Sequence, residues 1–142
     1  MVYKTGEGVE FKVVKIHKLE NVNFILGQSY FIKTIEDIAE AVVGFVPGAM
    51  FVLAISEALG DYLIRIDGND EDLMALARDN AKVIGAGHSI ILLLRDFYPF
   101  NILNAIKNLN EVCTIYCATA NAAEIVIAES LQGRGLMGVI NG

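Results

Sequence analysis

The alternation of apolar and polar residues along the chain predicts most of its strands. Residues 9–13 (VEFKV) alternate apolar with charged positions, and several later segments are runs of β-branched and aromatic residues. The segments 50–56 and 62–66 flank the short connection Leu59-Gly60-Asp61, which is typical of an antiparallel hairpin. Eight segments have strand-like patterns, and we expect about seven strands among them: 9–13, 22–26, 50–56, 62–66, 89–94, 112–118, 124–128 and 136–140.

Helical spacing of apolar residues predicts about three helices between these strands. The first opens at Thr34, with Asp37 as its capping-box partner, and ends at Gly44. The second follows a start signal at Asn69 and Asp72 and is terminated by Gly85, and the third covers 102–109. Runs of strands do not alternate strictly with helices, so we predict one α+β domain over 1–142, with the helices packed on a mostly antiparallel or mixed sheet.

Composition and charge limit the kinds of partner and the cellular compartment that we expect for the protein. The net charge of −6 argues against a nucleic-acid partner, because binding to phosphate backbones requires a basic face. The polar start 1–8 lacks the apolar stretch of a secretory signal, and the uncharged segment 41–56 is too short to span a membrane. We expect a cytoplasmic protein without a membrane partner, and its 54% hydrophobic content favours a homo-oligomer, for which we expect a trimer or a multiple of it.

The cysteines and the acidic loop give no metal signature. Cys113 and Cys117 lie four residues apart in a predicted strand, too far apart to bridge, so we expect two reduced thiols. The loop 67–72 (DGNDED) lacks the glycine and glutamate that a calcium-binding EF-hand requires. We interpret it as a turn before a helix that begins with acidic residues, and we assign no metal ligands. The alternative is that Asp67 or Asp70 binds a Mg²⁺ ion that enters with a nucleotide.

Glycines around a histidine form the most informative local motif. In 85–89 (GAGHS), Gly85 and Gly87 leave little bulk beside His88 at the start of a strand, so a ligand can approach it closely. The imidazole then serves as a phosphoryl acceptor or as a base toward a ribose hydroxyl. The alternative is a helix C-cap followed by a histidine that its neighbours satisfy.

Cations and amides elsewhere in the chain offer phosphate and base contacts. Lys33, Arg95 and Arg134 stand beside glycines or conspicuous polar residues, and the segment 133–135 (GRG) reads either as an anion-binding backbone nest or as a hairpin turn. Asn121, between two predicted strands, matches an adenine edge with its amide but is equally typical of a turn.

Taken together, several ordered motifs resemble the adenosine-specific kinase family. The motifs are GQSYFIKT (27–34), GND (68–70), GAGHS (85–89), LRDFYP (94–99), NILNAIK (101–107), CATAN (117–121) and GRG (133–135). The resemblance implies a small, often archaeal, oligomeric α+β protein that binds adenosine, AMP or ADP and is associated with phosphohistidine. It implies His88 as the phosphorylated residue and Asn101, Asn104 and Asn121 as pocket residues.

Two departures from the family pattern bear on the chemistry. Tyr30 stands where members commonly have histidine, and Ala122 where they commonly have proline. If the family's phosphorylated histidine were the one at position 30, phosphotransfer would be lost while nucleotide binding could remain.

Three functions are therefore compared. In the first, ATP or another phosphate donor phosphorylates His88 or His88 assists transfer to adenosine, with Mg²⁺ and an arginine offsetting the developing charge. In the second, the protein binds or senses an adenosine nucleotide without turnover, as the absence of the common kinase and P-loop motifs allows. In the third, which ranks last, the chain is a purely structural oligomer.

Overall fold

The computed structural model describes residues 8–30, 33–57 and 63–142. These residues form eight strands, three α-helices and one short 3₁₀ helix. In chain order the elements are β1 (Glu10–Lys15), β2 (Val22–Ser29), α1 (Thr34–Phe45), β3 (Met50–Ser56), β4 (Ile64–Gly68), α2 (Glu71–Ile84), β5 (Ser89–Arg95), η1 (Pro99–Asn101), α3 (Leu103–Lys107), β6 (Val112–Thr119), β7 (Ala123–Glu129) and β8 (Arg134–Asn141).

The strands form two antiparallel sheets. A five-stranded sheet has the order β4-β3-β5-β2-β6, and a three-stranded sheet has the order β1-β7-β8. Each pairing between described strands is antiparallel. The α+β prediction is thus confirmed, with eight strands where about seven were expected. The β3–β4 pairing is antiparallel as predicted, whereas the Leu59–Asp61 connection lies outside the described residues.

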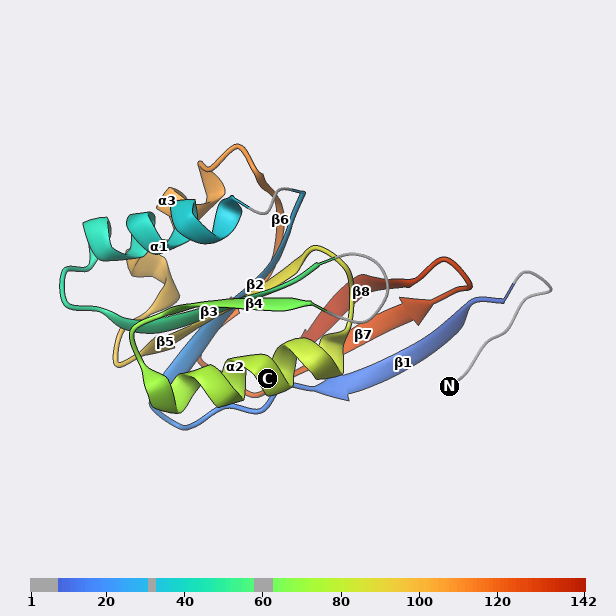
Figure 1. The fold of residues 1–142 in the computed structure, drawn as a ribbon. Coiled ribbons are helices and arrows are strands. Elements are labelled where there is room, and N and C mark those ends of the chain that lie inside the picture. The colour runs from blue at the N-terminus through green and yellow to red at the C-terminus, as the bar shows by residue number, and fades with distance from the viewer. Residues whose placement is uncertain (1–7, 31–32, 58–62) are drawn as a thin grey trace.

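Helices cover the five-stranded sheet on both faces (Figure 1). On one face, α1 and α3 bury Ile38, Val42 and Ile106 against alternate residues of β2, β3 and β5. On the other, α2 and the three-stranded sheet pack against the remaining alternate residues of the same strands. The central strand β5 is therefore buried on both faces, which explains its continuous apolar run in place of an alternating pattern.

Helix α2 starts and ends at residues that differ in part from the predicted signal. Asp70 is its N-cap and accepts a hydrogen bond from Leu73 N–H at 3.3 Å, while Gly85 ends it in the left-handed conformation, as predicted. The predicted start at Asn69 and Asp72 is therefore wrong in detail. The Asn69 amide bonds the start of β3 instead of the helix. Its Oδ1 accepts from Phe51 N–H and its Nδ2 donates to Ala49 O, so it holds the backbone where the chain enters β3.

A buried asparagine ties α2 to the connection between β1 and β2. Asn80 is fully buried; its Oδ1 accepts from His17 N–H at 2.8 Å and its Nδ2 donates to His17 O at 2.7 Å. We expect Asn80→Ala to lower the free energy of unfolding by about 2 to 3 kcal/mol, because both backbone groups of His17 lose their partner. Denaturant unfolding measures this, and Asn80→Asp should cost at least as much, because it buries a carboxylate oxygen against the His17 carbonyl. An Asn80→Ala change within error of the wild type would contradict it.

The cysteines and helix lengths bear on two further expectations. Cys113 is exposed and Cys117 is buried, and both are free, as predicted. Burial raises the pKa of the Cys117 thiol above its ordinary value, so this group is held in its neutral form. Within the part of the chain that is described, no helix is both long and apolar enough to cross a membrane.

Candidate functional site

The connection between α2 and β5 places His88 at one end of the five-stranded sheet. Gly85 ends α2 at φ 57°, with its N–H donating to Ala81 O, and the chain then passes through Gly87 to His88. His88 itself has φ 64°, and it is one of two non-glycine residues with positive φ in the described chain. Such a conformation is uncommon for a residue with a side chain and persists only where neighbouring structure holds it.

Backbone hydrogen bonds on both sides hold His88 in this conformation. Its N–H donates to Ser56 O at 2.7 Å, at the end of β3, and its carbonyl accepts from Ser29 N–H at 2.9 Å, at the end of β2. The imidazole therefore starts from a backbone that is fixed between two strands, while the side chain itself is exposed. A fixed main chain with an accessible side chain is the arrangement that a reactive or ligand-binding group requires.

Arg134, the first residue of β8, lies against the same glycine. Its Nη1 atom is 2.8 Å from the position that a Cβ atom at Gly85 would occupy, so a side chain at position 85 would displace the guanidinium. The Nε atom is buried and has no hydrogen-bond partner among the described residues. A buried cationic donor without an acceptor is costly, and a bound anion would satisfy it.

His88, Arg134 and the glycines line one cavity of about 870 Å³. This volume lies within the range of sites that bind small molecules. One wall comes from the five-stranded sheet and the end of α2, and the other from the hairpin between β7 and β8. The lining residues are Val9, Glu57, Gly85, Gly87, His88, Ala128, Glu129, Ser130, Leu131, Gln132, Gly133, Arg134 and Gly135.

The structure thus brings together four of the nine residues that sequence reasoning selected. Gly85, Gly87, His88 and Arg134 share the cavity, and the two glycines beside Arg134 line it as well. Sequence reasoning missed Glu57 and Glu129, which also line it. Each is bound to a cation, Glu57 to Arg65 and Glu129 to Lys12. No local signal marks either glutamate, because each stands at a strand end and meets the cavity only through the packing of the two sheets.

The three predicted asparagines lie at other places in the fold. Asn101 is in η1, where its Oδ1 accepts from Tyr98 N–H at 3.1 Å, and Asn104 is exposed on α3. Asn121 is exposed in the connection between β6 and β7, and its N–H donates to Thr119 Oγ1 at 3.0 Å. This contact is typical of a turn, which was the alternative interpretation of Asn121.

Lys33 precedes α1 and has an acidic environment. It lies near the Asp37 and Glu111 side chains, which share a hydrogen bond. That hydrogen bond raises the pKa of the Glu111 carboxyl, and Lys33 opposes the rise. A raised pKa favours the protonated form of Glu111. Lys33 is not among the residues that line the His88 cavity.

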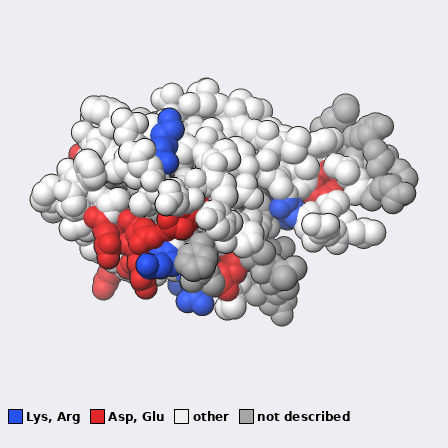
Figure 2. Space-filling view, turned by 90° about the horizontal axis from the view of Figure 1, so that it is seen from above, with Lys and Arg blue, Asp and Glu red and all other residues white. Residues whose placement is uncertain are grey.

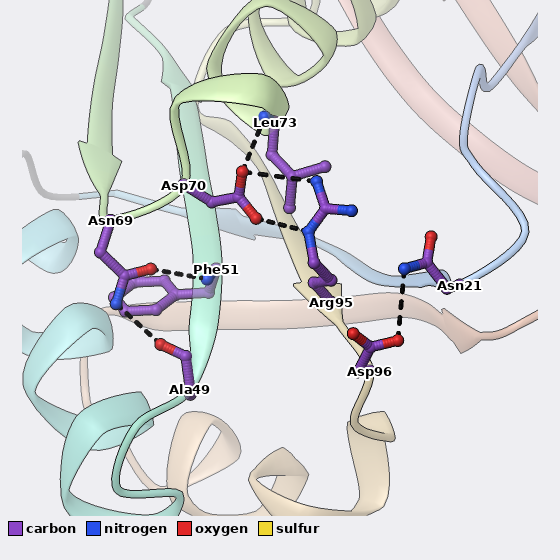
Figure 3. Close-up of polar contacts among 8 residues, drawn as sticks. All are labelled: Asn21, Ala49, Phe51, Asn69, Asp70, Leu73, Arg95 and Asp96. Carbon is purple, nitrogen blue, oxygen red and sulfur yellow. Dashed lines mark hydrogen bonds and ion pairs between the residues drawn. The ribbon is translucent and has the colours of Figure 1, made fainter.

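Arg95 is engaged in an ion pair at the start of α2 (Figure 3). Its Nε donates to Asp70 Oδ2 at 2.6 Å, and the Asp70 side chain is only 5% exposed. The hydrogen bond from Arg95 lowers the pKa of the Asp70 carboxyl, against burial, which raises it. The same carboxylate also caps α2, so both of its oxygens have protein partners. Asp67 Oδ1 accepts from Gly68 N–H, and across the described chain no three metal-ligating side chains cluster.

Acidic side chains gather over part of one face, with few basic side chains beside them (Figure 2). This distribution agrees with the net charge of −6. Long-range electrostatics therefore does not favour an anionic ligand, and any phosphate has to be met by particular cations at short range. Arg134 is a cation of the cavity whose Nε has no acceptor in the described structure.

Comparison with known proteins gives one family and one similar fold. The model of the family described as "Adenosine specific kinase" matches residues 14–142. Among solved structures, of which five chains match, the PH1918 protein from Pyrococcus horikoshii OT3 is 44% identical, with a TM-score of 0.89 over 94% of this chain and 83% of that one. No curated protein matches the chain significantly. Because the family model covers nearly all of the sequence, the chain belongs to the adenosine-specific kinase family.

Proposed function

We propose that the protein binds an adenosine nucleotide in the cavity between its two sheets and transfers phosphate through His88. The observation that carries this proposal is the meeting of an exposed, backbone-fixed imidazole and a buried, unsatisfied arginine Nε, among the described residues, in one cavity of about 870 Å³. The family to which the chain belongs supplies adenosine as the nucleoside.

The proposed chemistry is nucleophilic attack by a neutral imidazole nitrogen on the terminal phosphorus of ATP. A nitrogen–phosphorus bond forms, the bond from phosphorus to the bridging oxygen breaks, and ADP leaves with that electron pair. Arg134 stabilises the charge on the transferring phosphoryl oxygens.

A matched pair of histidine substitutions tests the proposal. The chain has two histidines, His88 and His17, and His17 is exposed and outside the residues that line the cavity. Asparagine tolerates positive φ better than alanine does, so His88→Asn removes the imidazole without adding backbone strain. After incubation with ATP and Mg²⁺, we expect one acid-labile phosphoryl group by intact-protein mass on the wild type and on His17→Asn, and none on His88→Asn. An acid-labile phosphoryl group that is still found on His88→Asn would exclude His88 as the acceptor.

Binding without turnover is the second candidate, and one feature of the cavity favours it. Glu57 and Glu129 line the same cavity, and the C-terminal end of α2, which carries partial negative charge, adjoins it. These groups oppose a highly charged phosphate and suit a less charged adenosine ligand. In this case AMP at 100 times its Kd should stabilise the wild type by about 2.7 kcal/mol with no change in protein mass. The absence of any thermal shift with adenosine, AMP or ADP would remove both candidates.

A further inference from the structure

We propose that Glu57 is the positioning residue for His88, an inference that rests on phosphotransfer through His88. The carboxylate would accept the N–H of one ring nitrogen, so that the other nitrogen presents its lone pair to the phosphate donor. Nothing in the local sequence pattern marks Glu57, which is the first residue after β3. The structure puts it on the wall of the cavity that His88 also lines.

The backbone brings the two residues together. Ser56, the residue before Glu57, accepts the hydrogen bond from His88 N–H at 2.7 Å, so the two chain segments are joined next to Glu57. Glu57 is anchored in turn, because its N–H donates to Leu63 O at 2.9 Å. Its side chain is only 16% exposed, and the position of its carboxylate in the cavity is therefore fixed by packing and not by solvent.

Arg65 keeps this carboxylate oriented. Its Nε donates to Glu57 Oε1 from the neighbouring strand β4, while its own side chain is 54% exposed. A carboxylate has two oxygens with about four acceptor positions, so one ion pair leaves capacity for an imidazole N–H. A hydrogen bond from the His88 ring to this carboxylate would give the arrangement of other histidine sites, in which a carboxylate fixes the tautomer of the ring that does the chemistry.

The role follows from the electron balance of the transfer step. When the free nitrogen attacks the terminal phosphorus of ATP, the ring acquires a positive charge as the nitrogen–phosphorus bond forms and ADP departs. A carboxylate on the opposite N–H stabilises that charge without taking up the proton. Glu129 also lines the cavity, but it lies on β7 of the other sheet and is bound to Lys12. Among the described residues, the His88 backbone bonds Ser29 and Ser56 of the five-stranded sheet and not β7.

The first measurement does not need any phosphate transfer. In ¹⁵N-labelled protein, the imidazole nitrogen shifts of neutral His88 report which nitrogen carries hydrogen, and His88→Asn identifies its signals against those of His17. We expect one tautomer in the wild type, a mixture in Glu57→Ala, and an intermediate result in Glu57→Gln, which keeps the shape and an acceptor oxygen but loses the charge. Glu129→Gln should keep the wild-type tautomer. An unchanged tautomer in Glu57→Ala would overturn the proposal.

The second measurement is the rate of phosphorylation by ATP, followed by intact-protein mass. We expect a decrease of about 10- to 100-fold in Glu57→Gln, the effect of losing one charge-assisted hydrogen bond. Glu124→Gln removes the same charge from an exposed position of β7 outside the cavity and should retain the wild-type rate. Equal rates in both variants would contradict the role of Glu57. A wild type that never becomes phosphorylated would refute the proposed function, and the tautomer measurement would still decide whether Glu57 orients the ring.

Discussion

Arg95→Met should lower the free energy of unfolding at pH 7 by about 3 to 5 kcal/mol, because it leaves the buried Asp70 carboxylate without its cation. The Asp70 side chain is only 5% exposed, and its Oδ2 accepts from Arg95 Nε at 2.6 Å. Methionine retains the length and apolar packing of the arginine stem, so the change tests the charge and not the volume. Urea unfolding of the wild type and the variant measures the difference.

The pH dependence of this loss gives an independent check. Arg95 holds the pKa of Asp70 below its ordinary value of 3.8, so the pair contributes stability that is fully present above that value. The contribution disappears as the pH falls through the lowered pKa of the folded state, where Asp70 becomes protonated. We therefore expect the wild type and Arg95→Met to differ most near neutral pH and to converge in acid. A constant difference between pH 7 and pH 2 would contradict this account.

A double variant separates the unpaired charge from the loss of packing. Asp70→Asn retains an oxygen that can cap α2 through Leu73 N–H, which the Asp70 carboxylate does at 3.3 Å. Asp70→Asn combined with Arg95→Met removes both charges. We expect it to be more stable than Arg95→Met alone, since no buried carboxylate remains unpaired. Simple additivity of the two single changes would show that the ion pair is not coupled.

Gly68→Ala should cost a comparable amount, about 3 to 5 kcal/mol, from backbone strain and steric overlap together. Gly68 ends β4 with φ 145°, and a Cβ atom there would lie 2.3 Å from Phe51 O and 2.7 Å from Val52 Cα. These atoms belong to the backbone of the neighbouring strand β3, so the contact cannot be relieved by rotation of a side chain. Thermal and denaturant unfolding measure the effect.

Gly48 provides the matched control for Gly68→Ala. It also has positive φ, at 81°, but a Cβ atom there meets no described atom within 4 Å. Gly48→Ala therefore reports backbone strain alone, and we expect it to cost about 1 kcal/mol. If the two variants lost the same stability, the close approach of β3 to Gly68 would be unimportant.

Local pattern predicted the elements of this fold well because the signals that define them are local. The apolar run of β5, the glycine after α2 and the spacing of apolar residues in α1 each act within a few residues of chain. The start of α2 was predicted less accurately, since Asn69 and Asp70 are both residue types that favour the N-cap position of a helix. Long-range contacts decide between them: Asn69 bonds the chain at β3, and Asp70 is left to cap the helix.

The candidate site was only partly predictable for the same reason. Gly85, Gly87 and His88 lie within four consecutive residues, so the sequence displays their motif, and Arg134 was conspicuous because glycines flank it. That these two segments meet depends on the packing of the three-stranded sheet against the end of α2, which no local pattern encodes. Arg95 was selected as a phosphate contact because it is a cation beside polar residues, yet its charge is used by Asp70, 25 residues away in sequence.

The two walls of the His88 cavity belong to different sheets. A molecule bound there would contact both sheets, so its binding would also stabilise their packing against each other. If the proposed ligand binds there, its affinity is coupled to the packing of the two sheets against each other. A substitution that weakens this packing, even one far from His88, should then lower the affinity for the ligand.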